Sequence, residues 1–203
     1  HNLPLMFNFL GIPYIDVIRS ILSFFPKKMN LNLKNRIFQK YINYLFKNPQ
    51  LHDQIEFELL ETCYAPLTEK RLSKKISYYE ILKYKPHLIN LTKKLIDLEN
   101  IKNQNKNVTF LNKKLNNPEL LKPNYISNIF TINELVKKYG TLTFSNFARY
   151  AFVAERILRD FKSEKYISEL DYYNFYNSLK TITYDMYKDL NKINNLERKK
   201  NFK

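Results

Sequence analysis

Residues 30–48, NLNLKNRIFQKYINYLFKN, carry the clearest helical pattern in this chain of 203 residues. Apolar side chains recur at intervals of three and four residues, at Leu33, Ile37, Tyr41, Tyr44 and Leu45. This spacing places them along one side of an α-helix, and Asn, Lys and Arg occupy the other side. The helix is expected to end at Asn48–Pro49, because a residue before proline disfavours the helical conformation. We therefore predict an amphipathic helix with one buried side.

Toward the N-terminus, two short apolar segments flank Gly11. LPLMFNF (3–9) and PYIDVI (13–18) are predicted as strands or extended segments on either side of a turn. The stretch 3–25 raises the question of a membrane span, but charged residues and a proline interrupt it. It also lacks the basic start and the small-residue cleavage site of a signal peptide. We expect no membrane anchor here.

Further along, LHDQIEFELLETCYAP (51–66) alternates apolar and polar residues. This alternation is typical of a half-buried strand. Residues 77–117 are predicted to be helical, with a solvated bend or loop at the Asn- and Lys-rich stretch 99–107.

The C-terminal part predicts further helices. TINELVKKYG (131–140) is predicted to end a helix at Gly140, a residue that suits a helix C-cap. The next helix is expected to begin after Thr143, and Ser168 and Asp171 have the spacing of a capping box. The expected fold is mainly α with a small β-sheet near the N-terminus (α+β), in one domain over residues 1–203.

Composition excludes several function classes. Only two glycines occur, so the Gly-rich loops that cradle nucleotide phosphates are absent. The net charge of +15 and pI near 9.6 suit a nucleic-acid partner, but the lysines are dispersed and no nucleic-acid-reading motif occurs. A nucleic-acid partner is therefore disfavoured.

Cysteine usage indicates a reducing compartment. Cys63 is the single cysteine, so the chain can form no internal disulfide, and we predict a buried thiol in a cytoplasmic protein. No cluster of Cys and His has zinc-ligand spacing, and no metal site is predicted. The chain begins at His1 rather than Met and ends in the polar run NNLERKKNFK. We expect it to be a fragment of a longer multidomain chain.

Three segments resemble a known family. NFLGIPYIDVIRSILSFFP (8–26), LHDQIEFELLETC (51–63) and YGTLTFSNFARYAFVAERIL (139–158), the last followed by SLKTIT, occur in this order. They are similar to the central region of phosphoenolpyruvate-synthase-like proteins, which are PEP/pyruvate-binding multidomain kinases. That region has segments of the types GxPYxDVRxSxxSFxP, LHDKVEFxxxxTC and ARHAFxAxxLLRS. The resemblance covers most of the chain apart from its Asn- and Lys-rich middle.

The resemblance implies a helical central substrate domain between an ATP-grasp domain and a swivelling phosphohistidine domain of the same parent chain. The parent enzyme would use ATP and Mg, split ATP into AMP and orthophosphate, and pass a phosphoryl group to the substrate through the phosphohistidine. This chain alone would hold no cofactor and would be inactive. In its Lys-, Asn- and Tyr-rich character the chain resembles members of this group that phosphorylate L-glutamine, and this resemblance implies a transferase of capsular polysaccharide phosphoramidate synthesis.

Such a substrate sets chemical requirements. A free amino acid needs a cation, ideally an arginine, for its carboxylate and a carboxylate for its ammonium group. Phosphoryl transfer needs further positive charge near the transferred group. The substrate-binding residues that the resemblance implies are Tyr14, Asp16, Arg19, Ser20, His52, Glu58, Arg149 and Tyr150. No catalytic residue is predicted in this chain.

The charged candidates have structural alternatives. Asp16 and Arg19 could pair with each other, His52 could belong to a turn or helix cap, and Glu58 could face solvent. Arg149 lies on a helix that is otherwise apolar, where an unpaired buried charge would be costly. It could contact a substrate anion or pair with an internal carboxylate.

The chain also departs from the family pattern. Ile18 stands where the family has Arg, Leu22 where it has Asn, and Tyr150 where it has His. The cation is one place later, at Arg19, and in a strand such a shift would move it to the opposite face. Two alternatives to a glutamine-phosphorylating enzyme therefore stay open. One is a related phosphotransferase that acts on pyruvate or another small molecule, and the other is a basic nucleic-acid-binding or scaffold module.

Overall fold

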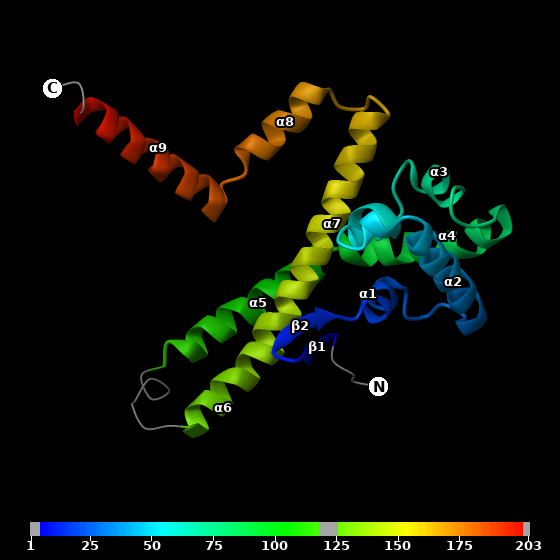
Figure 1. The fold of residues 1–203 in the computed structure, drawn as a ribbon, viewed down its shortest axis with the longest axis horizontal. Coiled ribbons are helices and arrows are strands. Elements are labelled where there is room, and N and C mark those ends of the chain that lie inside the picture. Colours follow the sequence, from blue (N-terminus) through cyan, green and yellow to red (C-terminus); the bar gives the residue numbers. More distant parts are fainter. Residues whose placement is uncertain (1–4, 118–125, 201–203) are drawn as a thin grey trace. The chain divides into compact units, whose positions relative to one another are not determined.

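The computed structural model describes residues 5–117 and 126–200, with the side chains of 5–117 and 127–192. The chain is mainly helical with a two-stranded antiparallel sheet near its N-terminus, which confirms the predicted fold class (Figure 1). Leu3 and Pro4 of the first predicted strand lie outside the described residues. The chain divides into two compact units, His1–Ile157 and Leu158–Lys203.

The first unit contains both strands and most of the helices. Its elements are β1 (Met6–Phe9), β2 (Ile12–Ile15), α1 (Val17–Phe24), α2 (Leu31–Lys47), η1 (Pro49–Leu51), η2 (Ile55–Leu59), α3 (Thr68–Leu72), α4 (Tyr78–Leu95), α5 (Leu98–Leu115), α6 (Ile126–Leu135), η3 (Val136–Thr141) and α7 (Leu142–Ser163). The last turns of α7 belong to the second unit, with α8 (Glu169–Ser178) and α9 (Ile182–Lys200).

β1 and β2 form the predicted hairpin, with Leu10 and Gly11 as its turn. Both turn residues have positive φ, 52° and 83°, as two-residue type I′ turns require. Gly11 adopts this conformation without strain, whereas for Leu10 the left-handed region costs about 1–2 kcal/mol. The Asn8 side-chain oxygen accepts a hydrogen bond from the Gly11 N–H at 2.8 Å.

The predicted strand over 13–18 is wrong beyond Ile15, because Asp16 caps a helix there. The Asp16 carboxylate accepts a hydrogen bond from the Arg19 N–H at 3.0 Å. This bond satisfies one of the N–H groups that the first turn of a helix leaves free, and aspartate is among the preferred residues for this position. Asp16 therefore marks the change from strand to helix.

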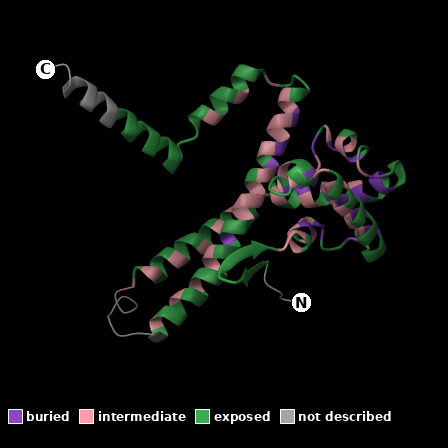
Figure 2. Cartoon of the chain, in the orientation of Figure 1, coloured by how far each residue is buried: buried purple, intermediate pink, exposed green. Residues whose placement is uncertain are grey.

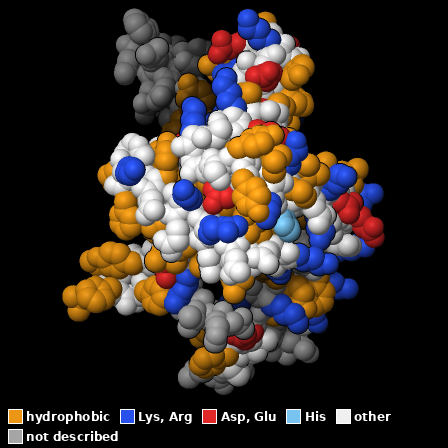
Figure 3. Space-filling model, turned by 90° about the vertical axis from the view of Figure 1, so that its right-hand side faces the viewer, with side chains coloured by type: hydrophobic (Ala, Val, Ile, Leu, Met, Phe, Trp, Pro, Cys, Tyr) orange, Lys and Arg blue, Asp and Glu red, His pale blue; other side chains and the backbone are white. Residues whose placement is uncertain are grey.

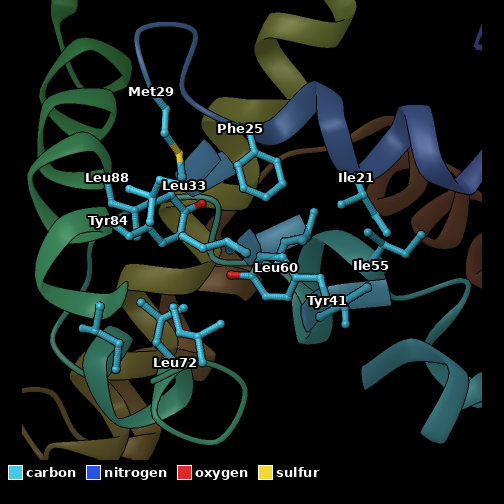
Figure 4. Packing of buried hydrophobic residues seen from close by; sticks show 14 residues of the cluster. Ile21, Phe25, Met29, Leu33, Tyr41, Ile55, Leu60, Leu72, Tyr84 and Leu88 are labelled. Carbon is cyan, nitrogen blue, oxygen red and sulfur yellow. The ribbon is translucent and has the colours of Figure 1, made fainter. Parts of the chain in front are cut away.

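α2 confirms the amphipathic helix predicted over 30–48. Leu33, Ile37 and Tyr41 are buried, and the remaining stripe residues are half-buried. The stripe packs into one core with side chains of α1, η2, α3 and α4 (Figure 4). The buried members of this core are Ile21, Phe25, Met29, Leu33, Ile37, Tyr41, Ile55, Leu59, Leu60, Leu72, Ile76, Ile81, Tyr84 and Leu88.

The strand predicted over 51–66 is wrong. Residues 55–59 form the π-helical turn η2, in which the Leu60 N–H donates to the Ile55 carbonyl at 2.9 Å. Ile55 and Leu59 are both buried, since residues four apart share one side of a helical turn. The turn makes its own backbone hydrogen bonds, whereas a strand here would need a neighbouring strand.

Residues 77–117 are helical as predicted, but the break lies at Ile96–Asp97 and not in the stretch 99–107. Asp97 caps α5 by accepting the Glu99 N–H at 3.0 Å. The Asn- and Lys-rich stretch lies inside α5, which has no buried residue. Its polar composition reflects exposure to solvent rather than loss of helix.

Gly140 does not end a helix, and its prediction as a C-cap is wrong. It lies within the π-helical turn η3, which joins α6 to α7. A Cβ atom on Gly140 would lie 3.3 Å from Leu111 Cδ2 and 3.5 Å from Val136 Cγ1. Glycine therefore allows α5 and η3 to approach closely. The helix start predicted after Thr143 is wrong for the same reason, because the backbone continues in helical conformation from η3 into α7.

In the second unit, α8 begins with the predicted capping box. The Asp171 N–H donates to Ser168 Oγ at 3.0 Å, and the Ser168 N–H donates to Asp171 Oδ2 at 3.2 Å. Figure 2 shows that buried residues gather in α1–α4 and part of α7, whereas the hairpin and the described side chains of α9 are exposed. Over the described ranges, no helix is long and apolar enough to cross a membrane.

Candidate anion-binding site

A pocket of about 380 Å³ lies in the first unit, between the loop after α1, one side of α4 and the start of α7. Its lining residues are Ser23, Phe25, Pro26, Lys27, Lys28, His87, Asn90, Leu91, Lys94, Leu142, Ser145, Asn146 and Arg149. We call it the Arg149 pocket.

Two helices contribute to the Arg149 pocket with the same spacing. The residues of α4 and of α7 that line it each stand at positions i, i+3, i+4 and i+7, from His87 to Lys94 and from Leu142 to Arg149. Residues at these intervals share one face of a helix. Each helix therefore turns one face toward the pocket, and each of these faces ends in a cation.

Arg149 connects α7 to the C-terminal end of α1. Its Nη2 donates to the Ser23 carbonyl oxygen at 2.7 Å, and its Cζ lies 5.1 Å from the centre of the Phe24 ring. Among the described residues, no carboxylate forms an ion pair with Arg149. Burial lowers the pKa of its guanidinium group, which nevertheless stays charged at neutral pH. A guanidinium group has five N–H donors, so one bond to Ser23 leaves donors for a ligand.

The charges that line the Arg149 pocket are all positive. Lys27, Lys28, Lys94 and Arg149 contribute four cations, and none of the described residues that line the pocket is Asp or Glu. On the face that Figure 3 shows, Lys and Arg side chains are scattered among apolar, acidic and neutral ones and form no continuous stripe. The pocket is thus a local concentration of positive charge that suits a carboxylate or phosphoryl group.

Tyr150, the neighbour of Arg149 in sequence, does not line the Arg149 pocket. Its ring lies 6.0 Å from that of Phe147, in an edge-to-face arrangement. Burial, and secondarily the negative charge of Asp97, raises the pKa of its hydroxyl group. Tyr150 therefore remains a hydrogen-bond donor at neutral pH.

Asp16 caps α1, and Arg19 and Ser20 lie in its first turn; none of the three lines the Arg149 pocket. Arg19 Nε and Asp16 Oδ2 are 3.2 Å apart, so the two residues form the ion pair that was one alternative for them. Ser20 is nevertheless next to the pocket residue Ser23, whose Oγ donates to the Ser20 carbonyl oxygen at 2.7 Å, and Arg19 stands one helical turn, about 6 Å, before Ser23. Since the segment is helical, a one-place shift of the cation turns it by about 100° rather than to the opposite face.

Tyr14 lies on β2 with an exposed side chain, and its ring meets that of Phe9 edge to face at 6.3 Å. His52 is exposed after η1, with Nδ1 3.0 Å from the Pro49 carbonyl oxygen, in the turn that was one alternative for it. Glu58 is exposed in η2. None of these three residues lines the Arg149 pocket.

A buried ion pair that the sequence analysis missed holds the segment after η2. Arg71 donates from Nε to Glu61 Oε1 and from Nη2 to Glu61 Oε2, both at 2.9 Å. The Glu61 side chain is 1% exposed. Such bidentate pairing satisfies a carboxylate that would be costly to bury alone. The pair fastens the segment 60–65 to α3.

Lys75 supports the same segment. Its Nζ donates to the carbonyl oxygens of Glu58 and Leu59, both at 2.7 Å. Burial lowers the pKa of the Lys75 amine to about 8, and the charges of Arg156 and Arg71 act in the same direction. Cys63, which belongs to this segment, is buried, as predicted.

The pocket residues that the sequence analysis missed had a usable signal. Lys27 and Lys28 directly follow the segment 8–26, and His87 to Lys94 carry the helical spacing described above.

In the part of the chain that the structure describes, no group of three or more His, Cys, Asp or Glu side chains could hold a metal ion. Comparisons with protein-family models, curated proteins and solved structures found no match.

Proposed function

We propose that this chain is the substrate-binding domain of an ATP-dependent phosphotransferase built like phosphoenolpyruvate synthase, and that the Arg149 pocket binds an anionic group of the substrate. One observation carries the proposal: two of the segments that resemble this family meet at the Arg149 pocket. Ser23, Phe25 and Pro26 belong to the first segment, and Leu142 to Arg149 to the third. Ser23 and Arg149 are 126 positions apart, yet both line this pocket.

The charges of the pocket support an anionic ligand. The guanidinium group of Arg149 can bind a carboxylate or a phosphoryl group through two parallel hydrogen bonds. Lys28 and Lys94 add point charges that such a group would need if it carried more than one negative charge. His87, Ser145 and Asn146 supply further polar groups for orientation.

L-Glutamine, phosphorylated for capsular polysaccharide phosphoramidate synthesis, is the first candidate substrate, on the resemblance. Its carboxylate would bind Arg149. ATP and Mg would bind the ATP-grasp domain, and a phosphohistidine domain would deliver the phosphoryl group. This chain alone would bind substrate without turnover.

A second candidate is a related phosphotransferase whose substrate is a carboxylate without an ammonium group, such as pyruvate. It is favoured because no described residue of the pocket lining is Asp or Glu, so an ammonium group would find no counter-charge among them. Asp16, the predicted carboxylate ligand that is nearest in sequence to the pocket residue Ser23, forms an ion pair with Arg19.

Calorimetric titration of the chain with L-glutamine, pyruvate and inorganic phosphate tests the proposal. We expect saturable binding of at least one of them, weakened tenfold or more in Arg149→Ala. Arg36→Ala, at an exposed position of α2, serves as the matched control and should bind like the original chain. A well-folded chain that binds none of the three anions would contradict the proposal, as would equal binding by both variants.

A further inference from the structure

The hairpin β1–β2 exposes apolar side chains on both of its faces. The large apolar side chains of residues 5–15 are between 41% and 90% exposed. The same stretch contains no charged residue, although charged residues make up 26% of the chain. An isolated two-stranded hairpin is marginally stable in water at best, and additional strands are one way to stabilise it.

The two edges of the hairpin differ in their free backbone groups. The Asp16 N–H donates to the Leu5 carbonyl at 2.9 Å, which identifies these opposite residues as a hydrogen-bonded pair. Bonded and non-bonded pairs alternate along an antiparallel ladder. The pairs Met6–Ile15 and Asn8–Pro13 are therefore the non-bonded ones, and their backbone groups point outward.

Only the β1 edge offers a complete set of these outward groups. Met6 and Asn8 each present an N–H and a C=O. On the β2 edge, Pro13 has no N–H to donate. The structure thus has one edge that can accept a further strand and one edge that is blocked.

We propose that β1 pairs with β1 of a second copy of this chain, antiparallel, around a two-fold axis at Phe7. In this register Met6 faces Asn8 of the second copy, and each such pair exchanges two backbone hydrogen bonds. The result is a four-stranded sheet in the order β2–β1–β1–β2. Its two outer edges carry Pro13, so the assembly closes at two copies instead of growing into a fibre.

The side chains and the charges of the hairpin suit this partner. In this register Leu5, Phe7 and Phe9, which share one face of the strand and are exposed, lie opposite Phe9, Phe7 and Leu5 of the second copy, so that apolar side chains pack across the seam. No like charges meet at the hairpin itself, since residues 5–15 are uncharged. The net charge of +15 on each chain opposes association at long range, so added salt should strengthen the dimer.

The molar mass in solution tests the proposal, with two variants at opposite residues. Light scattering coupled to size exclusion should give twice the 24.6 kDa of one chain at micromolar concentration in 0.15 M salt. Met6→Pro removes an outward N–H from β1 and should give a monomer. Ile15→Pro removes the corresponding N–H from β2 and should leave the dimer intact. A monomeric original chain, or the same mass for both variants, would overturn the proposal.

A cross-link gives an independent readout that does not depend on proline. Phe7→Cys places two thiols opposite each other at the two-fold axis, and mild oxidation should yield a disulfide-linked dimer. Tyr14→Cys, on the outer strand, should not cross-link. Cross-linking by Tyr14→Cys alone would assign the contact to β2 and refute the arrangement.

Discussion

Arg149 Nη2 lies 2.7 Å from the Ser23 carbonyl oxygen, and this bond ties α7 to the last turn of α1 across 126 positions of sequence. It brings together two segments that resemble one family and places a charged donor at the wall of a pocket whose described lining residues include no acid. The same contact contributes to stability and fixes the position of the guanidinium group at the pocket wall.

Arg149→Ala should destabilise the chain by about 1–2 kcal/mol, because the Ser23 carbonyl loses a charged hydrogen-bond partner. The loss should stay within this range, since both partners are partly exposed and water can replace the donor. Urea unfolding monitored by circular dichroism measures the change. Arg36→Ala, on the exposed side of α2, should change the free energy of unfolding by less than about 0.5 kcal/mol. Equal effects of the two changes would contradict this role of Arg149.

Arg71→Ala should lower the free energy of unfolding more than Arg149→Ala does, by about 3–5 kcal/mol. The reason is that it leaves the buried Glu61 carboxylate without its arginine partner. The double change Glu61→Met with Arg71→Met should recover much of this loss, since it removes both charges from the interior. Lys137→Ala breaks an exposed ion pair with Glu134 and should cost less than about 1 kcal/mol. Thermal unfolding of the three variants separates these cases, and an Arg71→Ala variant as stable as Lys137→Ala would refute the importance of the buried pair.

Lys75 should make stability rise with pH above 8. Its pKa is about 8 in the folded chain and about 10.4 when unfolded. Between these values the unfolded state binds the extra proton, so the free energy of unfolding increases with pH. The neutral amine keeps two N–H donors for the Glu58 and Leu59 carbonyls.

Tyr41 and Tyr84 set the upper end of this pH range. Burial raises the pKa of both hydroxyl groups, so above about pH 10 the unfolded state loses protons that the folded state retains, and stability falls. Urea unfolding between pH 7 and 11 should show a maximum between about pH 9 and 10. Lys75→Met should be less stable overall but should lack the rise above pH 8. The same rise in both proteins would exclude Lys75 as its cause.

Leu10→Asn should stabilise the hairpin, because asparagine tolerates positive φ and Asn-Gly is the preferred type I′ turn. A gain of about 1 kcal/mol corresponds to roughly fivefold slower amide exchange at the Phe7 and Tyr14 amides, which point into the hairpin. Leu10→Val, which adds a β-branched residue at the same φ, should speed exchange. The opposite order of the two variants would contradict the strain assigned to Leu10.

Several elements could be predicted from the sequence because their signals are local. The spacing of Leu33, Ile37 and Tyr41 indicated α2, and Ser168 with Asp171 indicated the start of α8. Gly11 correctly placed the turn of the hairpin. In each case the residues that carry the pattern also make the contacts that stabilise the element.

The errors arose where one pattern fits two structures. Ile55, Phe57 and Leu59 satisfy both strand alternation and a helical turn, and the described residues place no partner strand beside them. Gly140 suits a C-cap and also a close helix contact, and only the position of Leu111 distinguishes the two.

The candidate site was predictable only in part. Arg149 stood out as a charge on an apolar helix. His87 and Lys94 reach the same pocket from another helix, and that proximity depends on how α4 packs against α7. Conversely, Asp16 and Arg19 looked like ligands from their residue types, but the helix that begins at Asp16 explains both side chains.

The most direct test of the Arg149 pocket as a substrate site is a two-dimensional NMR titration of the ¹⁵N-labelled chain with L-glutamine, followed by pyruvate and inorganic phosphate. The account predicts saturable shift changes centred on Ser23, Lys28 and Arg149, and their loss in Arg149→Ala. Shift changes centred on Asp16 and Arg19 instead, or none with any of the three anions, would contradict it.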